Sequence, residues 1–131
     1  MTILQKIFTG LFLLTLVHCS TGYDNKGSAV YYKHWDESIG QQKEKIEANP
    51  VTFKILKFDR YAKDDKYVFY RGQIIEGADA ATFESIEEFY ARDKNTGYYG
   101  DDPVKNSNGK TFQVVNSYYS TDGKDFMKQN L

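Results

Sequence analysis

The chain has 131 residues, of which 40% are hydrophobic and 27% are charged, and its formal net charge is −1. This length suits one small domain, and the composition excludes wholesale disorder. The balanced charge gives no electrostatic reason to expect binding to nucleic acid.

The N-terminal segment predicts export. Residues 7–17 form an apolar run of 11 residues, which is shorter than the about 20 residues of a membrane-spanning helix and fits the core of a signal peptide. Cys19, the single cysteine of the chain, follows this run and resembles the cysteine of a bacterial lipobox, which carries lipid after cleavage. We therefore predict a lipoprotein signal peptide over 1–18, although His18 stands where lipoboxes have a small residue. The alternative is ordinary secretion with cleavage after Gly22.

The next segment, residues 19–29, is polar and contains glycine, which predicts a flexible tether between the lipid and the domain. Residues 30–131 then form the single expected domain. A lipid on Cys19 predicts a location in the bacterial cell envelope, anchored to the outer membrane and facing the periplasm or the surface.

A phrase of about 29 residues recurs within this domain. Its first part is a Thr-Phe pair, which occurs as Thr52-Phe53, Thr82-Phe83 and Thr111-Phe112. Three positions before each threonine stands an Asn or Asp, namely Asn49, Asp79 and Asn108. Asn and Asp are favoured helix N-caps, and an aliphatic residue follows each phenylalanine at the i+3 spacing of one helical face. We expect a short capped helix in each unit, with the three phenylalanines buried between helix and sheet.

A turn and a strand complete the phrase. The turns are Asp64-Asp65-Lys66, Asp93-Lys94-Asn95 and Asp122-Gly123-Lys124. Strands are expected at 68–71, 97–100 and 126–128, and at 30–33 as an earlier copy without a preceding hairpin partner. Units of this size stack because none can bury its own apolar face. The predicted fold is therefore α+β and β-rich, with about three tandem units of ~29 residues, each a short N-capped helix plus a β-hairpin.

The whole pattern, a capped Thr-Phe followed by Tyr-Ala-[Lys/Arg]-Asp, a turn and an aromatic pair, resembles the bacterial DKNYY family, named for Asp-Lys-Asn-Tyr-Tyr. Here the corresponding stretch is Asp93-Lys94-Asn95, two inserted residues, and Tyr98-Tyr99. The resemblance covers roughly residues 46–128. It implies an exported, often lipid-anchored repeat protein, and it brings no catalytic residues.

Strand alternation divides the aromatic pairs into two sets. We expect the first set in the core: Tyr31, Phe69, Tyr98 and Met127. We expect the second, more polar set to face water: Tyr32, Tyr70, Tyr99 and Lys128. Together with nearby Trp35, the three tyrosines of the second set form the candidate binding surface. The alternative is that they pack across strands, which stabilises a sheet by about 0.2–1 kcal/mol per pair.

Catalytic and metal-binding patterns are weak. The mature chain contains one histidine, His34, and no G-x-S-x-G, H-E-x-x-H or phosphate-loop motif, so we predict neither an enzyme nor a cofactor. Asp93, Asn95 and Gly97 resemble the start of a calcium loop, but Val104 stands where the loop needs a glutamate. We therefore predict a turn here and no metal site.

Two classes of function remain. The first is a non-enzymatic cell-envelope lipoprotein whose repeat domain binds a protein partner, either a toxin or an envelope protein; one form of it is a periplasmic immunity protein. The alternative is a carbohydrate-binding or adhesion lipoprotein of the surface, whose aromatic side chains stack on sugars. In both, the N-terminal lipid provides contact with the membrane.

Overall fold

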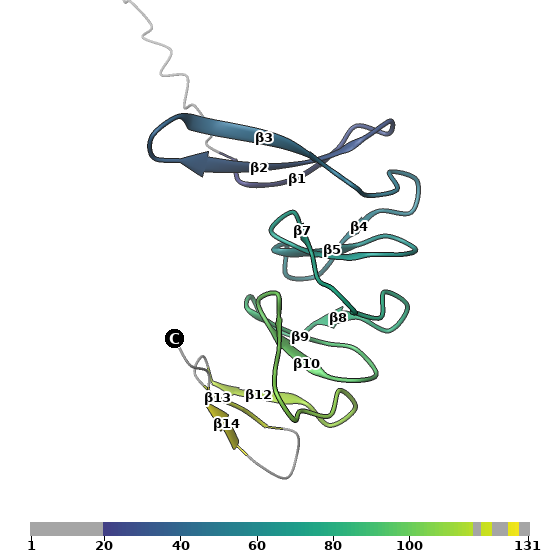
Figure 1. Cartoon of the computed structure of the whole chain (residues 1–131), viewed down its shortest axis with the longest axis vertical. Coiled ribbons are helices and arrows are strands. Elements are labelled where there is room, and N and C mark those ends of the chain that lie inside the picture. The colour runs from purple at the N-terminus through teal and green to yellow at the C-terminus, as the bar shows by residue number, and fades with distance from the viewer. Residues whose placement is uncertain (1–19, 117–118, 122–125, 129–131) are drawn as a thin grey trace, which may run out of the picture.

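The computed structural model describes residues 20–116, 119–121 and 126–128. These residues form four small antiparallel sheets stacked along the long axis of the molecule (Figure 1). The described part of the chain contains no helix. The predicted α+β class, with a helix in each unit, is therefore wrong: the described part of the protein is all-β.

Each sheet is a meander in which consecutive strands pair. The first sheet contains β1 (Gly22–Asn25), β2 (Val30–Asp36) and β3 (Gly40–Ile46). The second contains β4 (Lys54–Ile55), β5 (Tyr61–Lys63), β6 (Val68–Tyr70) and β7 (Gln73–Ile74). The third contains β8 (Glu84–Ser85), β9 (Tyr90–Arg92), β10 (Gly97–Tyr99) and β11 (Asp102–Pro103). The fourth contains β12 (Gln113–Asn116), β13 (Tyr119–Thr121) and β14 (Phe126–Lys128).

The segments predicted to start helices form tight turns instead. The carbonyl of Asp79 accepts the amides of Thr82 (3.2 Å) and Phe83 (2.9 Å), which completes one turn before β8 begins. The side chains of Asn49 and Asn108 each accept the amide two residues ahead, at 3.1 and 3.0 Å. This is the Asx turn, in which the same oxygen that would cap a helix closes a local loop. Pairing of the following residues with the next strand then prevents the turn from continuing as a helix.

The first sheet begins inside the segment predicted to be a tether. Gly22–Asn25 forms β1 and pairs with β2, with Tyr23 opposite Tyr32. Residues 30–33 therefore do have a preceding hairpin partner, contrary to the prediction, and the fold starts eight residues before the expected boundary at residue 30. Cys19 lies outside the described residues.

Tyrosine hydroxyls connect successive sheets. A pair of tyrosines faces each other across two strands in three sheets, with ring centroids 4.9–5.1 Å apart: Tyr23 and Tyr32, Tyr61 and Tyr70, Tyr90 and Tyr99. The hydroxyl of Tyr61 donates to the carbonyls of Phe89 (2.8 Å) and Gly100 (3.0 Å) in the next unit. The hydroxyl of Tyr23 donates in the same way to the carbonyl of Arg60, 3.1 Å away. Tyr23 and Tyr61 thus each connect one sheet to the next through a hydroxyl group.

The basic residue of the Tyr-Ala-[Lys/Arg]-Asp phrase makes a second connection. The Lys63 ammonium donates to the carbonyls of Ala80 (2.8 Å) and Phe83 (3.0 Å), and the Arg92 guanidinium donates to the carbonyl of Phe112 (3.0 Å). Burial lowers the pKa of Lys63, since desolvation disfavours the charged form. Both cations therefore hold the Thr-Phe turn of the unit that follows.

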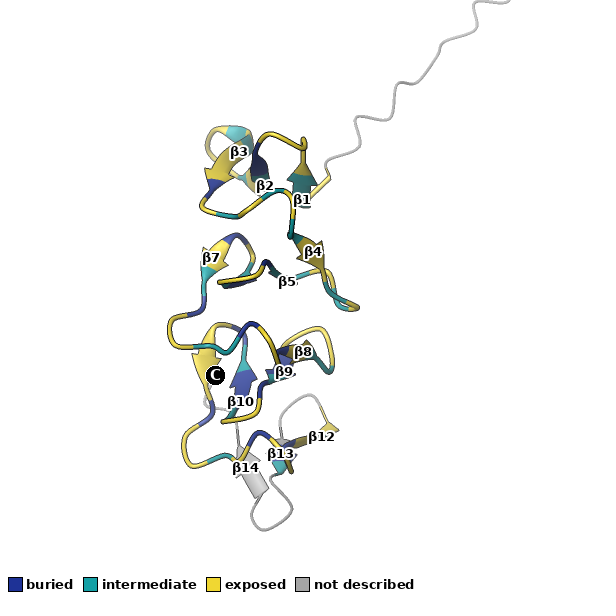
Figure 2. Ribbon diagram, turned by 90° about the vertical axis from the view of Figure 1, so that its right-hand side faces the viewer, coloured by how far each residue is buried: buried dark blue, intermediate teal, exposed yellow. Residues whose placement is uncertain are grey.

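The core lies between the sheets, and buried residues concentrate in the middle of the stack (Figure 2). Phe83 and Phe112 are buried as predicted, whereas Phe53 is half-buried against the cluster shared by the first two sheets. That cluster also contains Tyr32, which is 7% exposed, so its predicted place on the wet face is wrong. In β2 the buried positions are Val30 and Tyr32, because this face packs on the second sheet.

The remaining aromatic residues follow the two predicted sets more closely. Phe69 and Tyr98 are buried, while Tyr70 and Tyr99 are half-buried. The prediction that Tyr31 lies in the core is wrong: it is half-buried and lies on the face of β2 opposite to Val30 and Tyr32. The side chains of Met127 and Lys128 are outside the described part of the structure.

Candidate functional site

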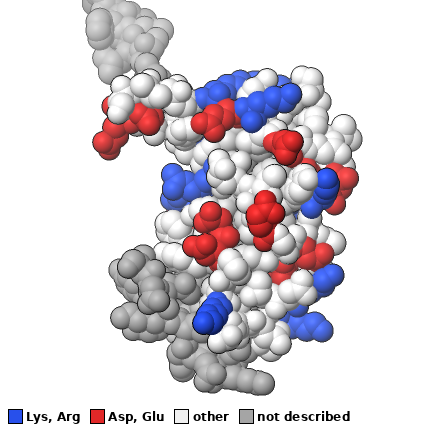
Figure 3. Space-filling model, in the orientation of Figure 1, with Lys and Arg blue, Asp and Glu red and all other residues white. Residues whose placement is uncertain are grey.

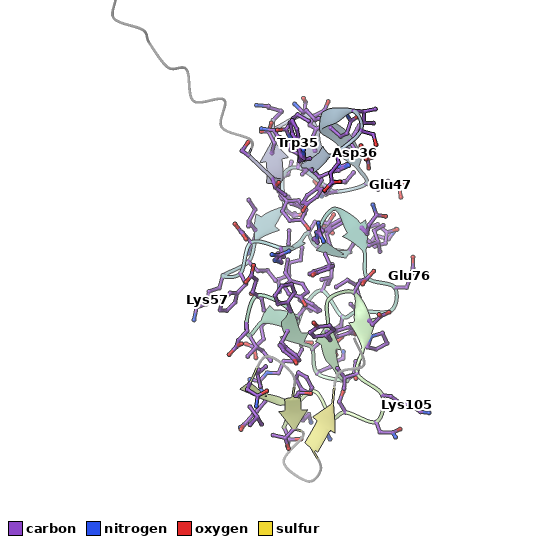
Figure 4. The ribbon with its side chains drawn as sticks, turned by 90° about the vertical axis from the view of Figure 1, so that its left-hand side faces the viewer. Trp35, Asp36, Glu47, Lys57, Glu76 and Lys105 are labelled. Carbon is purple, nitrogen blue, oxygen red and sulfur yellow. The ribbon has the colours of Figure 1, made fainter. Side chains whose placement is uncertain are left out.

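A groove of about 560 Å³ opens at the junction of the first and second sheets. Its lining residues come from the segment just before β1, from β2, β3, β6 and β7, and from the hairpin turns of the second and third sheets: Thr21, Tyr32, His34, Trp35, Glu44, Tyr70, Arg71, Gly72, Gln73 and Asp101. Three of the four residues predicted to form the binding surface, Tyr32, Trp35 and Tyr70, therefore meet in one groove. Trp35 belongs to the first sheet, at the end of the stack (Figure 4).

The hairpin between β6 and β7 sets the floor of this groove. Arg71 and Gly72 both have positive φ angles, 48° and 83°, as a two-residue type I′ turn requires. A Cβ on Gly72 would lie 2.7 Å from the Cβ and ring of Tyr32, so only glycine fits there without movement. The amide of Gly72 also donates to the hydroxyl of Tyr23, 3.1 Å away. The turn is thus held against the first sheet, and the Arg71 side chain is exposed beside the groove.

The aromatic residues of the groove differ in how accessible they are. Trp35 is 56% exposed, whereas Tyr32 is largely covered by Gly72 and stacks on His34, with ring centroids 6.3 Å apart. Tyr70 is half-buried, and desolvation raises the pKa of its hydroxyl, which stays protonated at neutral pH. Trp35 and the edge of Tyr70 therefore offer contact area, and Tyr32 supports the groove from below.

Charged side chains surround these aromatic residues. Glu44, Arg71, Gln73 and Asp101 are exposed, and they bring both signs of charge and an amide to the rim. None of the four was identified from the sequence as a binding residue. An Arg-Gly dipeptide at the end of a predicted strand is a signal for an exposed hairpin turn, and it would have marked Arg71 as an exposed turn residue.

A second hollow of about 350 Å³ adjoins the groove and shares Thr21, Tyr32 and Arg71 with it. Arg60 and Glu88 stand on its other side as an ion pair with a 2.6 Å contact. Because both side chains are partly exposed, this pair contributes little stability by itself. The Arg60–Glu88 pair extends the mixture of positive and negative side chains from the groove toward the third sheet.

Tyr99, the fourth predicted surface residue, is not among the residues that line the groove. Its ring packs against Tyr90, 5.1 Å between centroids, and against Phe89, 6.2 Å away. Tyr99 therefore belongs to the contact between neighbouring strands of the third sheet, one unit farther along the stack. For this residue the alternative of cross-strand packing describes the structure.

Asp93, which was considered as a calcium ligand, is 3% exposed. Its carboxylate accepts the amides of Asp79, Asn95 and Thr96 and the hydroxyl of Tyr98 at 2.8–2.9 Å. Its oxygens are thus committed to the turn. Within the described residues there is no group of three or more His, Cys, Asp or Glu side chains that could hold a metal ion.

Comparison with known proteins identifies a family. No curated protein and no solved structure matches the chain, and the described residues include no helix long and apolar enough to cross a membrane. The model of the DKNYY family matches residues 8–102, which starts earlier and ends earlier than the 46–128 expected from the repeat. Since this match spans more than half of the chain, the protein belongs to the DKNYY family.

Proposed function

We propose that this protein is a non-enzymatic lipoprotein of the bacterial cell envelope whose repeat domain binds a protein partner through the groove between the first two sheets. The observation that supports this most strongly is the meeting of Trp35, Tyr70 and Arg71 at one groove. Trp, Tyr and Arg are the residue types that dominate the energy of protein interfaces. Trp35 is 56% exposed, so a partner can cover a large apolar area there.

The anchor in this proposal is a lipid on Cys19, which holds the domain at the outer membrane, facing the periplasm or the surface. Gly22 begins β1, so the attachment point would lie three residues before the fold. The test is Cys19→Ser in cells that process lipoproteins. We expect the variant to lose lipid labelling and to move from the membrane to the soluble fraction; a variant that is labelled and fractionates like the wild type contradicts the anchor.

A partner of known identity gives the sharpest test of the groove. The products of the genes next to this one, a toxin in the case of a periplasmic immunity protein, would be purified and titrated against the full chain by calorimetry. Trp35→Ala and Arg71→Ala should each weaken binding by about thirtyfold, the effect of losing a hot-spot residue. Val51→Ala is the control, because Val51 is 87% exposed and does not line the groove. Equal loss in all three variants would contradict a partner site at the groove.

The alternative, a carbohydrate-binding or adhesion lipoprotein, draws support from the same site. An exposed indole with Glu44, Gln73 and Asp101 around it offers a stacking surface and hydrogen-bonding groups for a sugar. A glycan array separates the two functions. Saturable binding to a defined glycan that Trp35→Ala abolishes would favour the sugar ligand over the protein partner.

A further inference from the structure

The first sheet has two faces of different character. Val30, Tyr32 and Ile46 are buried against the second sheet. The strand register places another set of side chains on the opposite face: Tyr31 lies across from Asp24 and Lys45, and Lys33 lies across from Lys43. No other described element covers this outer face, which forms one end of the stack (Figure 1).

The outer face is strongly basic. Three ammonium groups surround the Asp24 carboxylate: Lys26 at 3.1 Å, Lys33 at 3.2 Å and Lys43 at 3.5 Å. With Lys45, the face holds four lysines and one aspartate and thus carries three net positive charges, although the whole chain carries −1. Basic side chains gather at this end of the molecule in Figure 3.

This accumulation of charge opposes the stability of the sheet. Lys33 and Lys43 are directly opposite each other, an arrangement that destabilises a strand pair. Asp24 offsets part of the repulsion, and the Lys43 ammonium also lies 4.3 Å from the centre of the Tyr31 ring. A face that keeps repulsive neighbours exposed fits an anionic partner better than it fits a purely structural role.

The position of the N-terminal segment indicates which anionic partner is near. Gly22, the first residue of β1, pairs with Lys33. Cys19 precedes it by three residues, which span at most about 10 Å when extended. The potential of an anionic membrane surface acts over about 8–10 Å at physiological salt. A lipid on Cys19 would therefore hold these lysines within the range of the headgroups.

We propose that the outer face of the first sheet docks on anionic lipid headgroups of the membrane that holds the protein. The proposal rests on the lipid anchor at Cys19. A second copy of the chain is a poorer occupant, because a two-fold contact of this face with itself would bring like charges together. In the docked state the groove, which Thr21 lines, lies beside the membrane, and the remaining sheets extend away from it.

The test uses the full chain with Cys19→Ser, so that no lipid is attached, and vesicles of phosphatidylcholine with or without phosphatidylglycerol. Lys26→Gln combined with Lys45→Gln should lower partitioning onto the phosphatidylglycerol vesicles by about 25-fold, since each lysine near an anionic surface contributes about fivefold. Partitioning onto pure phosphatidylcholine should be the same for the Cys19→Ser parent chain and for the variant that also lacks Lys26 and Lys45. Residues 1–19 are common to all variants, so their contribution cancels in the comparison.

The matched control is Lys105→Gln combined with Lys110→Gln, which removes two exposed lysines from the third and fourth units. This pair should leave partitioning within about twofold of the parent chain. Equal partitioning of the Lys26/Lys45 variant and the parent, or an equal loss in the control pair, would overturn the docking face. So would a dimer in sedimentation velocity that Lys45→Gln abolishes, because the face would then bind a second copy.

The docking face and the lipid anchor can be refuted separately. If Cys19→Ser releases the protein from membranes in cells but the lysine variants bind vesicles normally, the anchor stands and the docking face is wrong. If the lysine variants lose vesicle binding but Cys19 carries no lipid, the face binds anionic lipid and the anchor is wrong. Loss of partner binding in Trp35→Ala tests the groove, and its measurement requires neither the vesicles nor the lipid.

Discussion

Asp93 holds the turn of the third sheet through four hydrogen bonds, and its replacement tests how the family phrase supports the fold. Oδ1 accepts the amides of Asn95 (2.8 Å) and Thr96 (2.9 Å), which closes the local turn. Oδ2 accepts the amide of Asp79 (2.9 Å) and the hydroxyl of Tyr98 (2.8 Å). The second pair ties the turn to a segment 14 residues away and to the core.

Asp93→Ala removes both acceptor oxygens, and with them four hydrogen bonds, and leaves buried donors unpaired. Hydrogen bonds to a charged group contribute about 1.5–3 kcal/mol each, but they are not additive within one network. We therefore expect a loss of about 3–5 kcal/mol in the free energy of unfolding. Asp93→Asn keeps one oxygen for the local turn and places an NH₂ group against the amide of Asp79, so it should lose about 1–3 kcal/mol.

Urea unfolding followed by circular dichroism measures both variants, with Asp102→Ala as the control. Asp102 is exposed in the same sheet, and its replacement should change stability by no more than about 0.5 kcal/mol. The reasoning is refuted if Asp93→Ala and Asp102→Ala unfold at the same midpoint. A variant Asp93→Asn that matches the wild type would show that the bond to Asp79 contributes nothing.

Three further predictions concern the same framework. In urea unfolding, Gly72→Ala should destabilise the fold by about 1–3 kcal/mol more than Gly27→Ala. Both glycines have positive φ, but only a Cβ on Gly72 meets the ring of Tyr32. Equal losses of stability would show that this contact is unimportant. Tyr61→Phe should lower the free energy of unfolding by about 1–2 kcal/mol, the contribution of a buried hydroxyl that donates to the next unit. Unchanged stability would show that this hydroxyl does not stabilise the contact between the units. Burial raises the pKa of Asp93, but its hydrogen bonds outweigh this and hold the pKa below 3.8, its ordinary value, so its stabilisation is present above that pH and is lost as pH falls through the depressed pKa. The wild type should therefore lose more stability than Asp93→Ala on acidification below about pH 4; parallel losses would contradict this.

The repeat was predictable because it depends on local chemistry and on spacing. Tyrosine, Asp and the Thr-Phe pair recur at 29 or 30 positions. The two described copies of the Asp turn make the same contact, since Asp64 accepts the amide of Asn49 as Asp93 accepts the amide of Asp79. The helices were not predictable in the same way. An Asn or Asp side chain that accepts a nearby amide starts a helix or closes an Asx turn with equal ease, and the conformation of the residues after Asp79 is decided by pairing of β8 with β9.

Some residues of the groove were predictable from the sequence and others were not. Trp35 and Tyr70 were predicted as surface residues from their aromatic character and from strand alternation, and both line it. Tyr32 was assigned to the wrong face because β2 has its buried positions one residue out of step with the pairs in β6 and β10. Arg71 was overlooked, because its place at the groove depends on how the hairpin of one sheet stacks on another.

By itself, the sequence determined that this chain is built from stacked units of about 29 residues with tyrosines and acidic turns at equivalent places, since these features depend on the spacing of residues along the chain. It also indicated the DKNYY family, which the family match confirms. Only the tertiary structure decided that the units are all-β, that β1 belongs to the fold, and that a groove lies between the first two sheets. These outcomes depend on strand pairing and on contacts between sheets, such as the approach of Gly72 to Tyr32, whose energies involve residues that lie far apart in the sequence.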